Sequence, residues 1–437
     1  MTDVNDLPTK RRMPFNRQAQ HDAKRVAILS QAARLFNGKG SRATTLQDIA
    51  GSLGLTKTSL YYYVRTKEEL IFQCYMAALD RQHQCLDTVE QRYANPFSRL
   101  SAFLVQQFHN WSGAMSGRDS YQAALLEIAS LQTPHRQAVE ANYIALFKRL
   151  RGYVRDGIAD GTLRPCEATS TTRAIIGSID WVFHWLHDVP EKQVDVIAKQ
   201  AIDIIARGLF AGDHDYTASG TVAPIDADLP IPGFNRDEQN RLKQQAFYKA
   251  GTWFFNRKGF NGASLDEIAD YLNVSKGAFY YHIRNKEDLL YQCYNYSLDI
   301  LAHVYDSAEA NDGTGMQKIE QTSRQIFYIQ NSNLGPLIRY NTITALPKAK
   351  RKRILARTDA INDRFVQFIE QGMSDGSIRR INPMVARNLL AGAINASMEI
   401  SLWRAVDDVD HAALDYFDVF YNGILGRSHN SRMEAPE

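Results

Sequence analysis

Residues 45–67 read TLQDIAGSLGLTKTSLYYYVRTK, and residues 264–286 read SLDEIADYLNVSKGAFYYHIRNK. Both belong to a longer match, because residues 36–75 align without a gap on residues 255–294, and 18 of the 40 aligned positions are identical. Chance does not produce such agreement, so the chain contains a duplication. Its offset of 219 residues is far longer than a solenoid repeat, so we interpret it as two copies of one domain.

A weaker match extends the duplication toward the end of each copy. GIADGTLR at 157–164 corresponds to GMSDGSIR at 372–379, at an offset of 215. Between the copies, residues 211–235 contain three prolines and four aspartates but neither lysine nor arginine, which is typical of a linker. A linker of this length reaches up to about 80 Å. It permits the copies to pack against each other as a dimer would.

The composition is that of an ordinary globular protein. Of the 437 residues, 44% are hydrophobic and 23% are charged, and the net charge is only +3. No apolar run is long enough for a membrane span, and the four cysteines have neither zinc nor disulfide spacing. No P-loop, nucleophile elbow, zinc-protease or dinucleotide motif is present. We therefore expect a cytoplasmic protein that is not an enzyme, with no catalytic residues, no metal and no cofactor.

Each quoted stretch has the pattern of two short helices joined by a tight turn. Apolar residues elsewhere in the chain recur at helical spacing, so the predicted fold class is all-α. In the quoted stretches, capping-box patterns begin the first helix, residues that tolerate a left-handed backbone end it, and a hydroxyl residue caps the second helix. The residues concerned are Thr45, Asp48, Gly54 and Thr56 in copy one, and Ser264, Glu267, Asn273 and Ser275 in copy two. The arrangement is a helix-turn-helix.

The second helix of each stretch is unusually polar and aromatic. In copy one, a single thin apolar stripe is formed by Leu60 and Val64. The remaining hydroxyls, lysine and rings suit contacts with phosphates and with base edges in a major groove, whereas the alternative is an exposed helix without a partner. The candidate DNA-contacting residues are Thr45, Thr56, Lys57, Thr58, Ser59, Tyr61, Tyr62 and Tyr63 in copy one, and Ser264, Ser275, Lys276, Gly277, Tyr280, Tyr281 and His282 in copy two.

Both stretches resemble the DNA-binding domain of the tetracycline-repressor (TetR) family. Copy one matches the family pattern at Thr45, Ile49, Ala50, Gly54, Leu55, Thr56, Leu60, Tyr61, Tyr63 and Lys67, and copy two at Ser264, Ile268, Ala269, Val274, Ser275, Phe279, Tyr280, His282 and Lys286. The family's phenylalanine is Val64 or Ile283 here, and its glycine is Asn273 in copy two. The resemblance implies that the candidates above face DNA and that Lys67 and Lys286 contact phosphate.

The resemblance also implies how the chain is divided. Family members usually hold one three-helix DNA-binding domain and one helical body that binds a small molecule and dimerises, whereas this chain holds two such units. We expect a basic arm (1–18), DNA-binding domain 1 (19–75), body 1 (76–210), a linker (211–235), DNA-binding domain 2 (236–294), body 2 (295–428) and a tail (429–437). The closing helices of each body resemble the family's dimerisation pair.

The two copies differ in their charge. Arg11 and Arg12 belong to a basic arm before copy one, which is suited to a minor groove or to phosphates, unless it is only a solvated tail. Copy two follows the acidic linker instead, so copy one is expected to bind DNA more strongly. At exposed positions of the second helix, Thr58 and Ser59 become Gly277 and Ala278.

These differences suggest a covalent pseudo-dimer on an asymmetric operator with half-sites one helical turn apart. If the chain dimerises instead, the assembly holds four DNA-binding domains. The overall prediction is a DNA-binding repressor released by a small molecule. The alternative is an architectural or protein-interaction protein that retained a duplicated fold.

The bodies contain many aromatic residues. By resemblance these could line an effector pocket for a hydrophobic or acyl-CoA-like compound, although ordinary core packing is the alternative for each. A basic run at Lys348, Lys350, Arg351, Lys352 and Arg353 is either a solvated face or a phosphate contact. The candidate ligand-binding residues are Phe108, Trp111, Tyr121, Trp181, His184, Tyr328 and Trp403.

Overall fold

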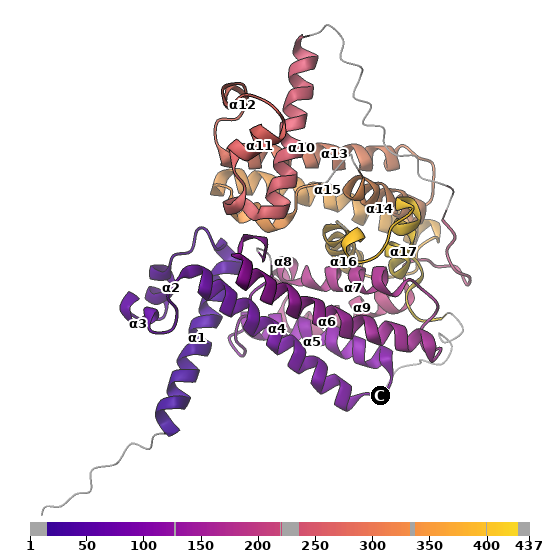
Figure 1. Ribbon diagram of the computed structural model, residues 1–437. Helices are drawn as coiled ribbons and strands as arrows, with labels where there is room; N and C mark the ends of the chain where they lie inside the picture. The colour runs from indigo at the N-terminus through magenta and orange to yellow at the C-terminus, as the bar shows by residue number, and fades with distance from the viewer. Residues whose placement is uncertain are drawn as a thin grey trace, which may run out of the picture.

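The structure is a computed structural model that describes residues 15–125, 128–218, 220, 236–332, 337–398 and 400–426. Among these residues the ordered elements are helices, apart from one isolated antiparallel bridge between Phe210 and Ile378, which confirms the all-α prediction (Figure 1). None of the described helices is both long enough and apolar enough to cross a bilayer. The predicted basic arm with Arg11 and Arg12, most of the linker and the tail lie outside the described residues.

The helices fall into two series of corresponding elements. Unit 1 contains α1 (Phe15–Lys39), α2 (Leu46–Ser52), α3 (Lys57–Tyr61), α4 (Lys67–Arg92), α5 (Pro96–Met115), η1 (Ile128–Ser130), α6 (Thr133–Ala159), α7 (Ala168–Asp180), α8 (Val182–Trp185), η2 (Leu186–Asp188), η3 (Glu191–Gln193) and α9 (Val194–Arg207). Unit 2 contains α10 (Arg236–Gly262), α11 (Leu265–Tyr271), α12 (Lys276–His282), α13 (Lys286–Glu309), α14 (Gly315–Asn331), η4 (Tyr340–Ala345), α15 (Lys348–Asp375), α16 (Pro383–Ala396), η5 (Ile400–Leu402) and α17 (Val409–Asn422). We call α1–α3 head 1 and α10–α12 head 2, and the remaining helices of each unit its body.

The predicted N-cap residues cap their helices in both heads, but the full capping box forms only in head 1, because the Glu267 carboxylate of head 2 pairs with Lys258 at 2.9 Å. The hydroxyl of Thr45 accepts a hydrogen bond from the backbone N–H of Asp48 at 3.1 Å, and the Asp48 carboxylate accepts from the N–H of Thr45 at 2.8 Å. Ser264 caps α11, and Thr56 and Ser275 cap α3 and α12, each through its side-chain oxygen. These bonds satisfy N–H groups that the first turn of a helix leaves without a partner.

The turn between the two short helices also follows the prediction. Gly54 has φ +65° and Asn273 has φ +52°, and Asn273 is the one non-glycine residue with positive φ among those described. Glycine and asparagine tolerate this backbone region better than other residues. The turn buries Leu60 and Val64 in head 1, and Phe279 and Ile283 in head 2, beneath α3 and α12. The two copies differ in sequence at these positions, but the turn between the two short helices has the same backbone geometry in both.

The two bodies pack on each other through the helices that close each unit. The core of this contact is made by α7 and α9 of unit 1 with α16 and α17 of unit 2. Arg164 Nε donates to the carbonyl of Gly423 at 2.6 Å, and Arg379 Nε donates to the carbonyl of Gly208 at 2.6 Å. These residues correspond at the offset of 215, so the contact is reciprocal, as in a two-fold symmetric dimer.

Two corresponding glycines allow the closest approach between the bodies. A Cβ added at Gly392 would lie 2.6 Å from Trp181 Cβ and 2.7 Å from the carbonyl oxygen of Gly177, the residue that corresponds to Gly392 in unit 1. Ser178 Oγ donates across the same contact to the carbonyl of Leu389 at 2.8 Å. Only residues without side-chain bulk permit helices α7 and α16 to come this near.

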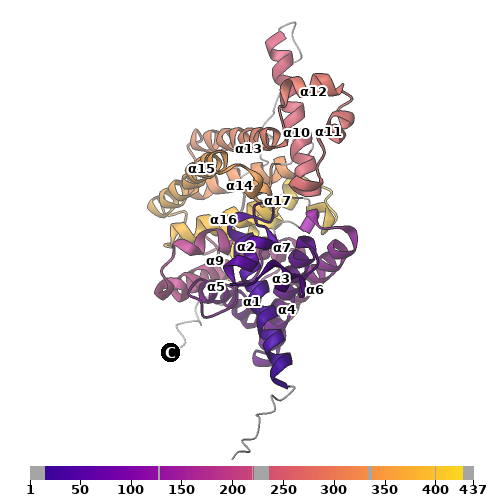
Figure 2. The ribbon, with the colours of Figure 1, turned by 90° about the vertical axis from the view of Figure 1, so that its left-hand side faces the viewer.

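The heads lie on one side of the packed bodies. In Figure 1 both are toward the left, head 1 below and head 2 above, and Figure 2 views the molecule from this side. Arg42, in the turn after α1, forms an ion pair with Glu287 of unit 2 at 2.7 Å and lies over the ring of Phe260 at 4.5 Å. The heads are therefore held together directly as well as through their bodies.

The chain that leaves unit 1 is attached to the body of unit 2. The hydroxyl of Tyr216 donates to Glu320 at 2.5 Å, and the backbone N–H of Tyr216 donates to Asn422 at 2.6 Å. Arg324, which is only 1% exposed, forms ion pairs with Glu320 and Asp410. A buried guanidinium needs such partners, because an unpaired charge in the interior is strongly destabilising. Tyr216, near the start of the linker, thus packs on the core as a half-buried residue.

We expect Gly392→Ala to destabilise the protein by about 1–3 kcal/mol, because the added methyl group overlaps backbone and side-chain atoms of α7. The matched control is Gly152→Ala in α6, where nothing lies within 4 Å of the added Cβ. That substitution should stabilise the helix by up to about 1 kcal/mol. Thermal unfolding followed by circular dichroism measures both, and equal effects of the two substitutions would contradict the close contact.

Candidate DNA-binding helices and effector cavity

Each head presents two tyrosines of its second short helix to solvent. Tyr62 is 77% exposed and Tyr281 is 85% exposed, and Tyr61 and Tyr280 are also exposed. Large aromatic side chains are seldom left in this state on a surface that contacts nothing. Lys57, Thr58 and Ser59 in head 1, and Lys276 and Gly277 in head 2, are exposed on the same helices. The candidate residues therefore form one exposed surface on each head.

The third aromatic position is less exposed because it packs on the first helix. The ring of Tyr63 stacks on His21 of α1 at a centroid distance of 4.9 Å. In head 2 the ring of His282 lies 5.6 Å from Phe247 of α10. These contacts fix the orientation of α3 and α12 on their heads, so the exposed neighbouring tyrosines are held on a rigid support.

Lys67 and Lys286 contact backbone carbonyls in this structure. Lys67 Nζ donates to the carbonyl of Ser41 at 3.1 Å, and Lys286 Nζ donates to those of Phe260 and Ala263 at 2.9 and 2.6 Å. Burial, followed by the nearby Arg42, lowers the pKa of Lys286. Both lysines thus secure the segment that follows the first helix of each head. The contact of these lysines with phosphate remains a prediction. It requires each ammonium group to donate one hydrogen bond to a phosphate oxygen while keeping, or giving up, a bond to a carbonyl.

The two heads differ in the charge beside the exposed helix. Lys276 Nζ lies 2.7 Å from Asp266 Oδ2, and the hydroxyl of Tyr280 donates to Asp266 Oδ1 at 3.2 Å. Head 1 has Gln47 at the position of Asp266, and Lys57 lies over the ring of Tyr61 at 5.6 Å. A carboxylate beside the lysine opposes its attraction to phosphate. Head 2 therefore presents a weaker positive field than head 1.

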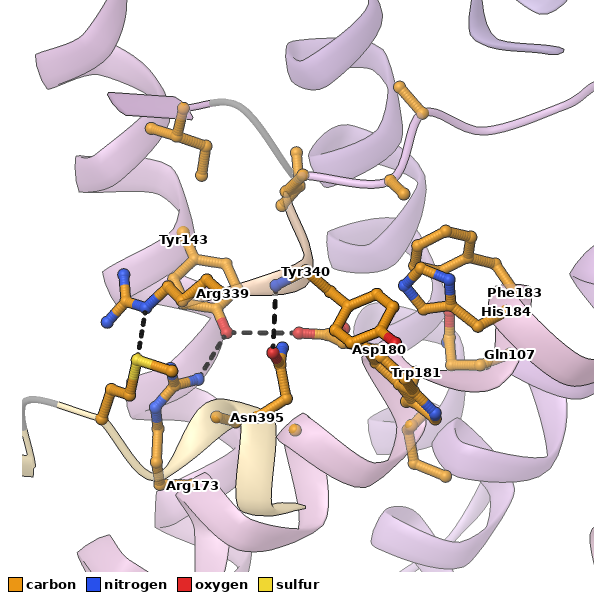
Figure 3. Close-up of a pocket in the computed structure, with 18 of the residues that line it drawn as sticks. Gln107, Tyr143, Arg173, Asp180, Trp181, Phe183, His184, Arg339, Tyr340 and Asn395 are labelled. Carbon is orange, nitrogen blue, oxygen red and sulfur yellow. Dashed lines mark hydrogen bonds between the residues drawn. The ribbon is translucent and has the colours of Figure 1, made fainter. Parts of the chain in front are cut away.

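A cavity of about 370 Å³ lies where body 1 meets unit 2 (Figure 3). Trp111, Trp181, His184 and Trp403, which are four of the seven candidate ligand-binding residues, line it. Phe108 is buried against Trp185, and neither Phe108, Tyr121 nor Tyr328 is among the lining residues. The cavity has the size and the aromatic lining of a small-molecule site.

The polar end of the cavity was not predicted. Figure 3 shows Tyr143, Arg173 and Asp180 directed toward one another. Arg173 Nη1 donates to the hydroxyl of Tyr143 at 3.2 Å, and that hydroxyl donates to Asp180 Oδ2 at 3.4 Å. Arg173 and Asp180 are seven residues apart on the largely apolar α7, so they lie on one helix face. That spacing of two charges in an apolar helix is the sequence signal that could have revealed them.

Asp180 and His184 have shifted pKa values because protein surrounds them. Burial raises the pKa of the Asp180 carboxyl to about 6, although Arg173 opposes the shift. Burial lowers the pKa of His184 to about 3, so this ring is neutral at physiological pH. Asp180 is nevertheless an exposed residue and is one of those that line the cavity. It offers a carboxylate to whatever occupies the cavity.

Corresponding asparagines connect the cavity wall to the first helix of each head. Asn37 Nδ2 donates to the carbonyl of Gln122 at 2.8 Å, and Asn37 Oδ1 accepts from the N–H of Ala124 at 3.0 Å. Asn256 makes the same pair of bonds with Leu337 and Arg339, both at 2.9 Å. The lining residues include Gln122, Ala124, Asn256 and Arg339. One cavity therefore contacts the attachment points of both heads.

We expect Asp180→Asn to raise the melting temperature at pH 8 by about 2–4 °C. Because the pKa of Asp180 is higher in the folded protein than in the unfolded chain, its ionisation opposes folding increasingly between about pH 4 and pH 6, and fully above that. The stabilisation should therefore shrink at pH 4.

The matched control has the opposite sign. Hydrogen bonds from Thr162 lower the pKa of Asp160, so Asp160→Asn should lower the melting temperature at neutral pH and less so in acid. Melting curves over this pH range check both variants, and a pH-independent effect of Asp180→Asn would contradict the raised pKa.

Two family models each match the chain twice. The model for bacterial regulatory proteins of the tetR family matches residues 28–74 and 248–293, and that for the tetracyclin repressor-like C-terminal domain matches residues 95–209 and 316–399. The first matches cover each helix-turn-helix, and the second cover most of each body.

Individual relatives match one unit at a time. The transcriptional repressor KstR2 of Mycolicibacterium smegmatis is 25% identical over 45% of this chain and 96% of its own length. The TetC protein of transposon Tn10 from Escherichia coli is 28% identical over 36% of this chain and 80% of its own. The structure of AibR in complex with isovaleryl coenzyme A and operator DNA is 26% identical, with a TM-score of 0.35, over 41% of this chain and 97% of that one. A nearly whole relative thus corresponds to less than half of this chain. The chain belongs to the tetR family of bacterial transcriptional regulators and contains two family units in tandem.

Proposed function

We propose that this DNA-binding regulator is a repressor whose two heads, in one chain, read two half-sites of one operator. The observation that carries the proposal is the reciprocal contact of the bodies, with Arg164 on Gly423 and Arg379 on Gly208, together with heads on the same side. A two-fold arrangement of helix-turn-helix domains matches two half-sites about one helical turn apart. The fused chain provides both domains without a second molecule.

The two half-sites of this operator differ in sequence. Thr58 and Ser59 in α3 are replaced by Gly277 and Ala278 in α12, so the two helices offer different groups to base edges. Head 1 contributes more of the affinity, because Asp266 offsets Lys276 in head 2. The predicted arm with Arg11 and Arg12 would add phosphate contacts on the side of head 1 only.

In this proposal, a ligand that binds in the cavity between body 1 and unit 2 causes the protein to release its DNA. The segments around Gln122 and Arg339 form part of its wall and also bind Asn37 and Asn256 of the two heads. A ligand that favours another position of these segments changes the spacing of the heads, and the operator then loses one of its two contacts.

A nuclease footprint on the DNA flanking the protein's own gene, at near-physiological salt, tests operator binding. Tyr62→Ala and Tyr281→Ala should each cost about 1–3 kcal/mol of binding while the protein stays folded. Ile144→Ala, which removes an exposed apolar side chain from α6 of body 1, is the control and should bind normally.

The form of the footprint separates the alternatives. One asymmetric site with two half-sites supports the single-chain pseudo-dimer, whereas a footprint about twice as long indicates a homodimer with four heads. Equal protection of flanking and random DNA would favour the architectural alternative. Normal binding by both tyrosine variants would overturn the assignment of α3 and α12.

Asp266→Gln, which gives head 2 the residue type of Gln47 in head 1, should strengthen operator binding. Once Asp266 is removed, Lys276 is available to a phosphate, so the slope of log affinity against log salt should steepen by about one. Fluorescence anisotropy at several salt concentrations measures it. Asp312→Asn removes the same charge from an exposed position in unit 2, outside head 2, and is the control. An equal change in both variants would show that only net charge matters.

A further inference from the structure

We propose that each chain binds one effector molecule, a neutral aromatic or alicyclic compound whose hydroxyl group donates a hydrogen bond to Asp180. This inference deepens the proposed function, because it names the ligand class of the cavity between body 1 and unit 2.

The residues that line this cavity divide into an apolar wall and one polar end. Trp111, Phe183, Trp181, Tyr340 and Trp403 supply flat rings, and Trp111 and Phe183 are stacked with their centroids 5.5 Å apart. Such walls bury rings well, because flat aromatic surfaces exclude water from both faces of a planar ligand. The occupant is therefore mostly a ring system rather than a flexible polar molecule.

At the polar end, Asp180 has unused capacity to accept hydrogen bonds. Among the described residues, Asp180 accepts one side-chain hydrogen bond, the long one from the Tyr143 hydroxyl at 3.4 Å, whereas an ionised carboxylate accepts several. Asp180 is also an exposed residue. A carboxylate that lines a cavity and has this unused capacity favours a ligand that carries a donor.

The charged side chains that line the cavity balance one another. Arg173 and Arg339 are basic, and Glu140 and Asp180 are acidic. A charged ligand would upset this balance on entering a partly enclosed space. A neutral hydroxyl satisfies the carboxylate without adding charge.

Unit 2 lacks a corresponding site. At the offset of 215, Tyr143, Arg173 and Asp180 correspond to Thr358, Asn388 and Asn395. Body 2 has a separate cavity of only about 80 Å³, which is smaller than the cavity of about 150 Å³ that is known to hold a benzene molecule. The cavity beside Asp180 exceeds that size, so the expected stoichiometry is one ligand per chain.

Calorimetric titration of the full chain with four naphthalene derivatives tests the proposal. The probes are 2-naphthol, 2-methoxynaphthalene, 2-naphthoate and 2-naphthylmethylammonium, which share a ring system and differ in the group offered to Asp180. We expect 2-naphthol to bind at one per chain and about 10- to 100-fold more tightly than the ether, which cannot donate.

The variants connect this preference to one residue. Asp180→Ala should abolish the difference between naphthol and ether, whereas Asp156→Ala, which removes an exposed carboxylate from α6, should preserve it. Circular dichroism checks that both variants are folded. Two sites per chain, tighter binding of the charged probes, a preference that survives Asp180→Ala, or no saturable binding of 2-naphthol would each overturn the proposal.

Measuring operator release separately distinguishes the ligand site from the proposed function. If 2-naphthol binds once per chain through Asp180 but does not release the operator, the ligand class stands and effector-controlled release fails. If release occurs with a charged probe only, release stands and the ligand class fails.

Discussion

The close contact of α7 with α16 is the constraint on which the rest of the structure depends. Gly177 and Gly392 face each other there, and Arg164 and Arg379 each donate to a glycine carbonyl of the other unit. Hydrogen bonds from charged donors are among the stronger ones in proteins. Because the contact is reciprocal, each such bond occurs twice, once from each unit. Because the bodies pack in this way, both heads lie on the same side of the molecule.

Covalent fusion changes what such a contact can do. In a homodimer, identical chains must provide identical sites, so any substitution appears twice. Here one body keeps Arg173 and Asp180 while the corresponding positions of the other are Asn388 and Asn395. The same freedom extends to the heads, where Asp266 stands in one copy and Gln47 in the other. The pairing geometry has been retained while the two functional surfaces have diverged.

The cavity lies beside the shared packing of the two bodies, and some of its lining residues differ between the two units. It lies at the edge of the reciprocal contact, and its wall includes the segments that hold Asn37 and Asn256. Asn37 and Asn256 are one of the identical pairs in the duplicated stretch, so the head is attached to the body in the same way in both units. Arg173 and Asp180 of the cavity, in contrast, correspond to uncharged residues in unit 2. In the proposed function, a single ligand would act on both heads through equivalent hydrogen bonds.

The sequence by itself determined the duplication, the all-α class, the helix caps and turns, and the exposed tyrosines of the two short helices. These features depend on residues a few positions apart, such as Thr45 with Asp48, or on a backbone conformation that Gly54 and Asn273 tolerate. Only the tertiary structure decided that Lys67 and Lys286 contact carbonyls, that Phe108 and Tyr328 do not line the cavity, and that Asp180 does. Those outcomes depend on which side chains from segments far apart in the sequence pack together, as Gln82 and Trp403 do around the cavity. Hydrophobic periodicity predicts which face of a helix is buried but not which residues cover it.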